Sequence, residues 1–323
     1  MGIMKLLVYL PCHTDFGQAV DQAKAIRQEY AKFSNSSKAV EIQIEIVLSV
    51  NAYLPNTEEK NMAEAICDKV IYNGNSFLAD INISNGFLLA LDRRPDFFWL
   101  LSANDTLVNG AIEKILAEFL EDASLDLLVC SLSESSVSLQ TQIIDPPPRA
   151  LYFGVITGVI YRLERLFPYL HNGPFMSWVG WPHLAVIQSA MDSLGGLKIK
   201  TIQRELIFIE GERDIETIRK YGYSIYGMLI LGSILKSTRR ESRRFIRKYV
   251  FSHFYDWHMY CGNYTYSGQL ISGKNYLGWN QKIAESLIWK SSPTAYIFYK
   301  IVKNIPFRKI RRLQRKVVKS FKN

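Results

Sequence analysis

The sequence predicts an α/β protein in which a mostly parallel, Rossmann-like sheet is flanked by helices. Short apolar segments of strand length alternate with longer segments of helical periodicity between residues 5 and 131. Several strand segments are apolar at successive positions, as in strands that helices cover on both faces. The chain has 323 residues, of which 48% are hydrophobic, so it can bury a substantial core.

The expected strands are short runs rich in apolar and β-branched residues. They cover residues 5–10, 40–50, 69–72, 97–101 and 125–131. Pro11 ends the first strand, and the second alternates in polarity before it becomes apolar, as a strand does that enters a covered sheet. The fourth, FFWLL, is apolar throughout and runs directly into a polar turn.

The expected helices lie between these strands. They cover residues 16–33, 58–67, 82–91 and 109–121. In the first helix Val20, Ala23 and Ile26 share one face, and in the third we expect Phe87 and Leu88 to face inward. The alternation of strands and helices is typical of a parallel sheet.

The charge is distributed unevenly along the chain. Residues 1–150 contain 11 basic and 20 acidic residues (net −9), whereas residues 151–323 contain 28 basic and 10 acidic residues (net +18). Most of the excess follows Glu216, after which 22 basic and 3 acidic residues remain. We therefore expect a sheet domain at 1–215 and a basic, mainly helical C-terminal extension at 216–323.

Cysteine use and hydropathy indicate a cytoplasmic protein that is soluble or peripheral to a membrane. The four cysteines lack the paired spacing of a disulfide framework or a zinc site, which predicts free thiols in a reducing compartment. The apolar N-terminal run stops at Pro11 without a cleavage site, so we expect a strand rather than a signal peptide. The uncharged aromatic and aliphatic stretch at 221–235 has 15 residues. That is short of the roughly 20 residues that span a bilayer.

Polar clusters follow four of the predicted strands. They are Cys12-His13-Thr14-Asp15, Asn51-Ala52-Tyr53, Asn73-Gly74-Asn75 and Ser102-Ala103-Asn104-Asp105. Turn formation would explain each cluster separately. Because ligands of such sheets bind beyond the carboxyl ends of the strands, the four together favour a nucleotide or sugar pocket. No glycine-rich dinucleotide fingerprint and no P-loop follows the first strand, which disfavours a dehydrogenase and a nucleoside triphosphatase.

Four segments stand in an order that resembles a known family. They are VYLPCH at 8–13, IVLSVN at 46–51, an Asn- and Gly-containing helix at 75–90, and WLLSANDTLVNGAIEKIL at 99–116. Over about residues 5–210 the chain resembles the family 2 glycosyltransferases of bacterial surface-polysaccharide synthesis, which have the GT-A fold. The resemblance implies that the protein binds a nucleotide-diphosphate sugar, with UDP as the default nucleotide. The donor-binding residues that it implies are Pro11, His13, Asn51, Asp80, Asn82, Asn104 and Asp105. His13 could equally lie in a polar turn.

The chain departs from this family at the metal motif. The family has Asp-x-Asp or a run of Asp, whose carboxylates hold Mg²⁺ or Mn²⁺. Here Ala103-Asn104-Asp105 leave one carboxylate, so metal binding through Asp105 is expected to be weak or absent, and metal-independent action is compatible with the sequence. The leaving diphosphate would then need cationic side chains or helix N-terminal amides. Alternatively, Asn104-Asp105 cap the helix near Asn109.

The acceptor side is expected at a helix that Trp181-Pro182-His183 opens. Many relatives carry a Glu-Asp pair there, which supplies the catalytic base; His183 is the nearest candidate in this chain, and imidazole titrates near neutral pH. A metal or diphosphate ligand and a structural residue are the alternatives for His183. Trp178 and Trp181 are candidates for stacking on an acceptor sugar, or for packing in the core.

The C-terminal extension combines basic and apolar residues at helical spacing. Residues 301–323 carry nine Lys or Arg and no acidic residue, and a second basic run lies at 236–248. A basic amphipathic helix favours an anionic membrane surface as partner. Packing of its apolar stripe against the body is the alternative. Nucleic acid is not an expected partner, because no nucleic-acid-binding motif accompanies the charge.

The resemblance implies a glycosyltransferase that moves a sugar from a nucleotide-diphosphate donor to a surface glycan or lipid-linked oligosaccharide. The reaction would take place at the inner face of the cell membrane. Inversion of the anomeric configuration is implied by the resemblance alone. Two other classes remain open: a non-catalytic GT-A-like scaffold of a glycan-assembly complex, and a basic surface-binding protein whose α/β half is only a platform. Binding of a sugar nucleotide distinguishes the platform from the other two.

Overall fold

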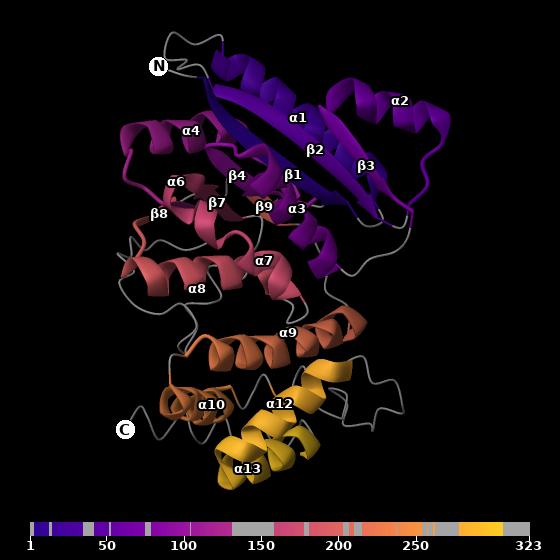
Figure 1. The fold of residues 1–323 in the computed structure, drawn as a ribbon. Coiled ribbons are helices and arrows are strands. Elements are labelled where there is room, and N and C mark those ends of the chain that lie inside the picture. Colours follow the sequence, from indigo (N-terminus) through magenta and orange to yellow (C-terminus); the bar gives the residue numbers. More distant parts are fainter. Residues whose placement is uncertain are drawn as a thin grey trace, which may run out of the picture. The chain divides into compact units, whose positions relative to one another are not determined.

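The computed structural model describes residues 3–12, 15–34, 42–51, 53–74, 79–103, 105–130, 158–177, 181–202, 207–209, 215–236, 238–253, 257, 261 and 278–305. Within these residues the central element is a mixed seven-stranded sheet (Figure 1). Its strands are β1 (Met4–Cys12), β2 (Ile42–Asn51), β3 (Lys69–Asn73), β4 (Phe97–Leu100), β6 (Leu127–Cys130), β7 (Val159–Arg162) and β8 (Ile199–Ile202). They lie in the order β3-β2-β1-β4-β7-β6-β8. Strands β1–β4 are parallel, as are β6 and β8, and β7 is antiparallel to both of its neighbours.

Strands β1 and β4 are the buried centre of this sheet. Side chains from Leu6 to Leu10 and from Phe97 to Leu101 are at most 1% exposed. Strand β2 begins with alternating burial and is buried throughout from Ile46 onward, which is the pattern that its sequence predicts. The α/β class with a mostly parallel sheet is confirmed, and the five predicted strands lie within two residues of β1, β2, β3, β4 and β6 at either end.

Helices cover both faces of the sheet (Figure 1). One face carries α1 (Phe16–Ser34), α2 (Thr57–Ile66) and α4 (Ala111–Glu121), whose apolar residues join the core above β1 and β4. The other carries α3 (Ala79–Arg93), α7 (Asn172–Phe175) and α8 (Pro182–Leu194). Phe87 of α3 packs edge-on against Phe98 of β4, with ring centroids 5.4 Å apart. The short α6 (Leu163–Leu166) and the 3₁₀ turn η2 (Phe167–Tyr169) join β7 to α7.

One residue of α3 does not face inward as predicted. Leu88 is 51% exposed, whereas Phe87 is fully buried. The buried face of α3 is centred on Asn82, Gly86 and Ala90, which recur one turn apart. The apolar pattern identified Phe87 but not the centre of this face, because two of the three central residues are an amide and a glycine.

After β4 the chain forms a strand rather than a helix cap. Strand β5 (Asp105–Leu107) pairs antiparallel with β9 (Ile207–Ile209), and Asp105 lies opposite Ile209. The alternative in which Asn104-Asp105 cap the next helix is therefore wrong. Helix α4 begins at Ala111, and its N-cap residue is Gly110, whose φ of +82° is favourable for glycine. The Gly110 N–H donates to Glu29 Oε2 of α1 at 2.5 Å.

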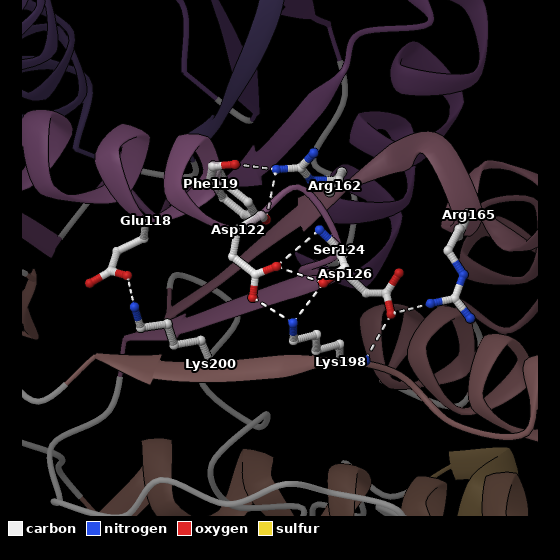
Figure 2. Close-up of polar contacts among 9 residues, drawn as sticks. All are labelled: Glu118, Phe119, Asp122, Ser124, Asp126, Arg162, Arg165, Lys198 and Lys200. Atoms are coloured by element: carbon white, nitrogen blue, oxygen red, sulfur yellow. Dashed lines mark hydrogen bonds and ion pairs between the residues drawn. The ribbon is translucent and has the colours of Figure 1, made fainter. Parts of the chain in front are cut away.

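A network of charged residues joins α4, β6 and β8 where β6 and β8 begin (Figure 2). The Asp126 side chain is 3% exposed and accepts hydrogen bonds from Arg165 Nη1 and the Lys198 backbone N–H, each 2.8 Å long. Lys198 Nζ pairs with Asp122 at 2.8 Å, and Lys200 pairs with Glu118. Because the network lies at the amino ends of parallel strands, it stabilises the sheet edge opposite to the ligand-binding edge.

The chain divides into two compact units. The sheet unit consists of Met1–Ile143, Ala150–Trp178 and Pro182–Gly211, and the helical unit of Ile144–Arg149, Val179–Trp181 and Glu212–Asn323. The main helices described in the helical unit are α9 (Ile215–Ile234), α10 (Arg239–Ser252), α12 (Gly278–Ser291) and α13 (Pro293–Asn304). Its core contains stacked and edge-on rings, among them Trp257 and Tyr299, whose centroids are 5.2 Å apart.

The predicted basic helix at 301–323 is described only in part. Residues 301–304 form the end of α13, and residues 306–323 lie outside the described residues. In the part of the chain that the structure describes, no helix is both long enough and apolar enough to cross a membrane.

Candidate functional site

The carboxyl ends of β1, β2 and β3 lie side by side and carry polar residues. In the strand register Pro11 lies opposite Ser49, and Asn51 lies opposite Asn73. Asn51 and Ser49 are fully buried, whereas Pro11 and Asn73 are half-buried. Parallel pairing therefore brings two of the predicted donor-binding residues, Pro11 and Asn51, to one edge of the sheet.

Asn82, in the first turn of α3, closes this edge. Its Oδ1 accepts hydrogen bonds from Tyr9 Oη at 2.9 Å and from Ser49 Oγ at 2.7 Å. Its Nδ2 donates to the Ser49 carbonyl at 3.3 Å, and Asn73 Nδ2 donates to Ser49 Oγ at 3.0 Å. Polar groups that would be costly to bury alone thus satisfy one another. We call this group the polar edge: Tyr9, Pro11, Ser49, Asn51, Asn73 and Asn82.

Tyr9 and Gly86 determine how closely α3 approaches the sheet. Burial raises the pKa of the Tyr9 hydroxyl far above its usual value, an effect that the hydrogen bond with Ser49 partly opposes, so Tyr9 stays protonated and donates to Asn82. A Cβ at Gly86 would lie 2.8 Å from Tyr9 Cδ1 and 2.8 Å from Leu100 Cδ2. Glycine at this position therefore lets α3 lie directly on β1 and β4, which brings Asn82 within reach of Ser49.

Sequence reasoning missed Tyr9 and Ser49 as members of this site. For Ser49 there was a signal, because a hydroxyl inside an otherwise apolar strand must find a partner when it is buried. For Tyr9 there was none, since tyrosine is common in strands and its hydroxyl partner comes from a distant helix.

Two further side chains lie next to the polar edge. Tyr53 follows β2, stacks on Phe16 with ring centroids 5.4 Å apart, and donates to Glu59 Oε1 at 2.9 Å. This hydrogen bond, together with burial, raises the pKa of Tyr53. Cys12, at the end of β1, is buried; burial and the charge of Asp15 raise the pKa of its thiol to about 11. Cys12 is therefore protonated at neutral pH and is not a thiolate nucleophile.

Asp105 follows β4 through a turn in which its backbone N–H donates to the Ser102 carbonyl at 3.2 Å. It is 7% exposed, and Ala103 beside it is 4% exposed. Among the residues that the structure describes, no group of three or more His, Cys, Asp or Glu side chains could hold a metal ion. Mg²⁺ and Mn²⁺ prefer several oxygen ligands. Asp105 and the described residues around it therefore do not form a complete metal site.

The acceptor-side candidates come from the start of α8 and are not members of the polar edge. His183 is in the first turn of α8 and is 1% exposed, whereas Trp181, immediately before the helix, is half-buried. His13, Asn104 and Trp178 lie outside the described residues. Asp80 is in the first turn of α3, but its side chain is not among those described.

No family model and no curated protein sequence matches the chain. Among solved structures, the mannosyltransferase PcManGT from Pyrobaculum calidifontis, in complex with GDP-Man and Mn²⁺, is similar at a TM-score of 0.53 and 9% identity, over 92% of this chain and 86% of that chain. A fragment of S. aureus TarS in complex with UDP-GlcNAc is similar at a TM-score of 0.43 and 12% identity, over 96% of this chain and 92% of that chain. The chain spans 44% of a longer TarS chain, at a TM-score of 0.45 and 12% identity over 78% of this chain.

The likeness to PcManGT, together with the strand order, shows that the fold is the GT-A fold. This confirms the fold that the sequence resemblance implies.

Proposed function

We propose that the protein is a glycosyltransferase that moves a sugar from a nucleotide-diphosphate donor to a surface glycan or a lipid-linked oligosaccharide. The observation that carries the proposal is the polar edge, where Asn51 and Asn73 end two parallel strands beside Pro11 of β1, and Asn82 bonds to Ser49 and Tyr9. Ligands of such sheets bind beyond the carboxyl ends of the strands. PcManGT, which shares the fold, was solved with GDP-Man, and this supports a sugar nucleotide as the ligand.

In the proposed complex the nucleoside, uridine by default, contacts Pro11 and Asn51, with His13 and Asp80 from the adjoining segments. Because Asn51 is fully buried, its contact requires a rearrangement at the end of β2. Asn82 has a different role from the one that the sequence resemblance implies. Both of its side-chain polar atoms are engaged by partners on β1 and β2, so we propose that it positions α3 rather than binding the donor directly.

Tyr53 is a further candidate for contact with the nucleobase. It is half-buried, follows Asn51 at the end of β2, and its ring is held by stacking on Phe16 and by the hydrogen bond to Glu59. A rigidly held ring beside the strand end suits stacking on a base.

The reaction requires one displacement at the anomeric carbon. The acceptor hydroxyl oxygen attacks that carbon, the bond to the diphosphate oxygen breaks, the nucleoside diphosphate leaves with the electron pair, and a base takes the hydroxyl proton. A single displacement inverts the anomeric configuration. We propose His183 as the base and Trp178 and Trp181 as stacking residues for the acceptor. Because His183 is 1% exposed, this role requires a rearrangement at the start of α8 that admits the acceptor.

Asp105 and Asn104 are proposed to contact the donor sugar. The Asp105 carboxylate and the diphosphate carry charge of the same sign, so we assign Asp105 to accept hydrogen bonds from sugar hydroxyls. The described residues do not form a complete metal site, so we propose that Mg²⁺ or Mn²⁺, if used, binds weakly through Asp105; metal-independent action is the alternative.

A non-catalytic scaffold with a GT-A fold is the second candidate. Two observations favour it: Asp105 stands without a second carboxylate in Ala103-Asn104-Asp105, and the candidate base His183 is buried. A scaffold could bind a sugar nucleotide but would not consume it.

The test is isothermal titration calorimetry with UDP, CDP, GDP and dTDP, each with Mn²⁺ and with EDTA. We expect one nucleotide to bind. Asn51→Ala should raise the dissociation constant for that nucleotide at least tenfold, or about 1.4 kcal/mol. Asn61→Ala is the matched control, because Asn61 is exposed on α2. Tight binding that EDTA does not change would argue against a metal. Absence of binding for all four would refute the donor site, and binding without hydrolysis or transfer would favour the scaffold.

We also propose that the protein works at the inner face of the cell membrane. The support is the excess of basic residues after Glu216, 22 against 3 acidic residues. A lipid-linked acceptor would be reached from this position.

A further inference from the structure

Helix α10 carries a stripe of cations on its exposed face. Arg240, Arg244, Arg247 and Phe251 recur at intervals of four, three and four residues, which places them on one side of the helix, and all are exposed. The opposite side, with Phe245, Ile246, Tyr249 and Val250, is buried. We call Arg240, Arg244 and Arg247 the basic stripe.

The basic stripe lines a groove that belongs to the helical unit. The groove has a volume of about 1060 Å³ and is lined by six Arg or Lys of α10, Phe251, Ser291 and one acidic residue, Glu241. The Glu241 carboxylate accepts hydrogen bonds from the Thr238 N–H at 3.1 Å and the Thr238 hydroxyl at 3.0 Å, as part of the capping box that begins α10. The lining thus has a large excess of positive charge, which is complementary to an anionic surface.

The stripe continues into apolar side chains on α13. Phe251 is 42% exposed and packs against Phe298, with ring centroids 4.8 Å apart. On α13, Ile301 lies one turn from both Phe298 and Ile297, and the two isoleucines are 54% and 56% exposed. We call Phe251, Ile297, Phe298 and Ile301 the apolar patch.

We infer that the basic stripe and the apolar patch together form a docking surface for the anionic face of a lipid bilayer. Arginine guanidinium groups form bidentate hydrogen bonds with phosphate, which is the anionic group of phospholipid headgroups. Insertion of exposed isoleucine and phenylalanine side chains at the boundary between headgroups and acyl chains is favourable, because it removes apolar surface from water. A soluble polyanion such as RNA would use the cations but gain nothing from the isoleucines. Only the role of this docking surface, which is to bring the enzyme to a membrane-linked acceptor, rests on the proposed function.

The test is co-sedimentation of the full chain with vesicles of phosphatidylcholine alone and of phosphatidylcholine mixed with phosphatidylglycerol. We expect binding to the mixed vesicles only. Arg244→Glu/Arg247→Glu should lower the partition coefficient about thirtyfold or more, since two favourable cations are lost. Ile297→Ser/Ile301→Ser should lower it about tenfold, while the charge of the stripe is unchanged.

The matched control is Lys69→Glu/Lys282→Glu. It changes the net charge by the same amount at two exposed lysines outside the stripe, and its vesicle binding should stay within a few-fold of that of the natural sequence. Equal loss in the control and in the stripe variant would overturn the inference, as would equal binding to neutral vesicles. Binding of single-stranded RNA through Arg244 and Arg247, with no vesicle binding, would identify a soluble polyanion instead.

Calorimetry with nucleotides on the same variants separates this inference from the proposed function. The stripe and patch variants should bind nucleotide as the natural sequence does. If the natural sequence binds no nucleotide, the proposed donor site is refuted, but the result of the vesicle experiment is unaffected.

Discussion

Asn82 links a helix to two strands through a single buried amide. Asn82→Ala would leave the Tyr9 and Ser49 hydroxyls buried without this acceptor, so we expect the free energy of unfolding to fall by about 2–4 kcal/mol. Urea unfolding followed by circular dichroism measures the loss. Adding Tyr9→Phe to Asn82→Ala should recover about 1 kcal/mol, because one orphaned hydroxyl is removed. A loss below about 0.5 kcal/mol in Asn82→Ala would show that the network does not stabilise the fold.

Gly86 and Gly17 form a matched pair of helix glycines. Gly86→Ala would press a methyl group against the buried Tyr9 and Leu100 side chains, each 2.8 Å from the new Cβ, and should destabilise the protein by about 1–3 kcal/mol. Gly17→Ala, with no atom within 4 Å of the new Cβ, should leave stability unchanged or raise it by up to about 1 kcal/mol. Thermal unfolding of both variants tests this. Equal effects would mean that α3 does not lie on β1 as described.

Among the elements, the edge formed by β6 and β8 depends on charge pairs that differ in burial (Figure 2). Asp126→Ala removes the acceptor of two hydrogen bonds from a side chain that is 3% exposed, so we expect a loss of about 2–3 kcal/mol. Lys200→Ala breaks a pair in which the lysine side chain is 45% exposed, and should cost at most about 1 kcal/mol. Chemical denaturation of both variants measures the difference. A larger loss for Lys200→Ala would contradict burial as the deciding factor.

Across the whole molecule, the basic excess lies in the second half of the chain. Residues 151–323 carry a net charge of +18, whereas residues 1–150 carry −9. Exposed charges are screened over about 10 Å at 0.1 M salt, so rising NaCl concentration should weaken vesicle binding steeply and change the thermal midpoint little. Co-sedimentation and thermal unfolding across the same salt series test this. Vesicle binding that does not depend on salt would mean that the apolar patch acts without the basic stripe.

Much of the fold could be predicted because local periodicity reports secondary structure. The four predicted helices of the first half lie within three residues of α1, α2, α3 and α4 at either end. The antiparallel placement of β7 between β4 and β6, and the separate β5–β9 pair, could not be predicted from spacing. These arrangements depend on contacts between segments far apart in the chain, which local patterns do not report.

The sequence by itself determined the alternation of strands and helices, the division into an acidic and a basic half, the polar residues at the strand ends, and the single carboxylate of Ala103-Asn104-Asp105. The tertiary structure decided which of these polar residues meet. Asn82 bonds to Ser49 and Tyr9, which are 33 and 73 residues away, and a partner at that distance is determined by packing. The docking surface has the same origin, since Phe251 and Phe298 become neighbours only when α10 packs against α13.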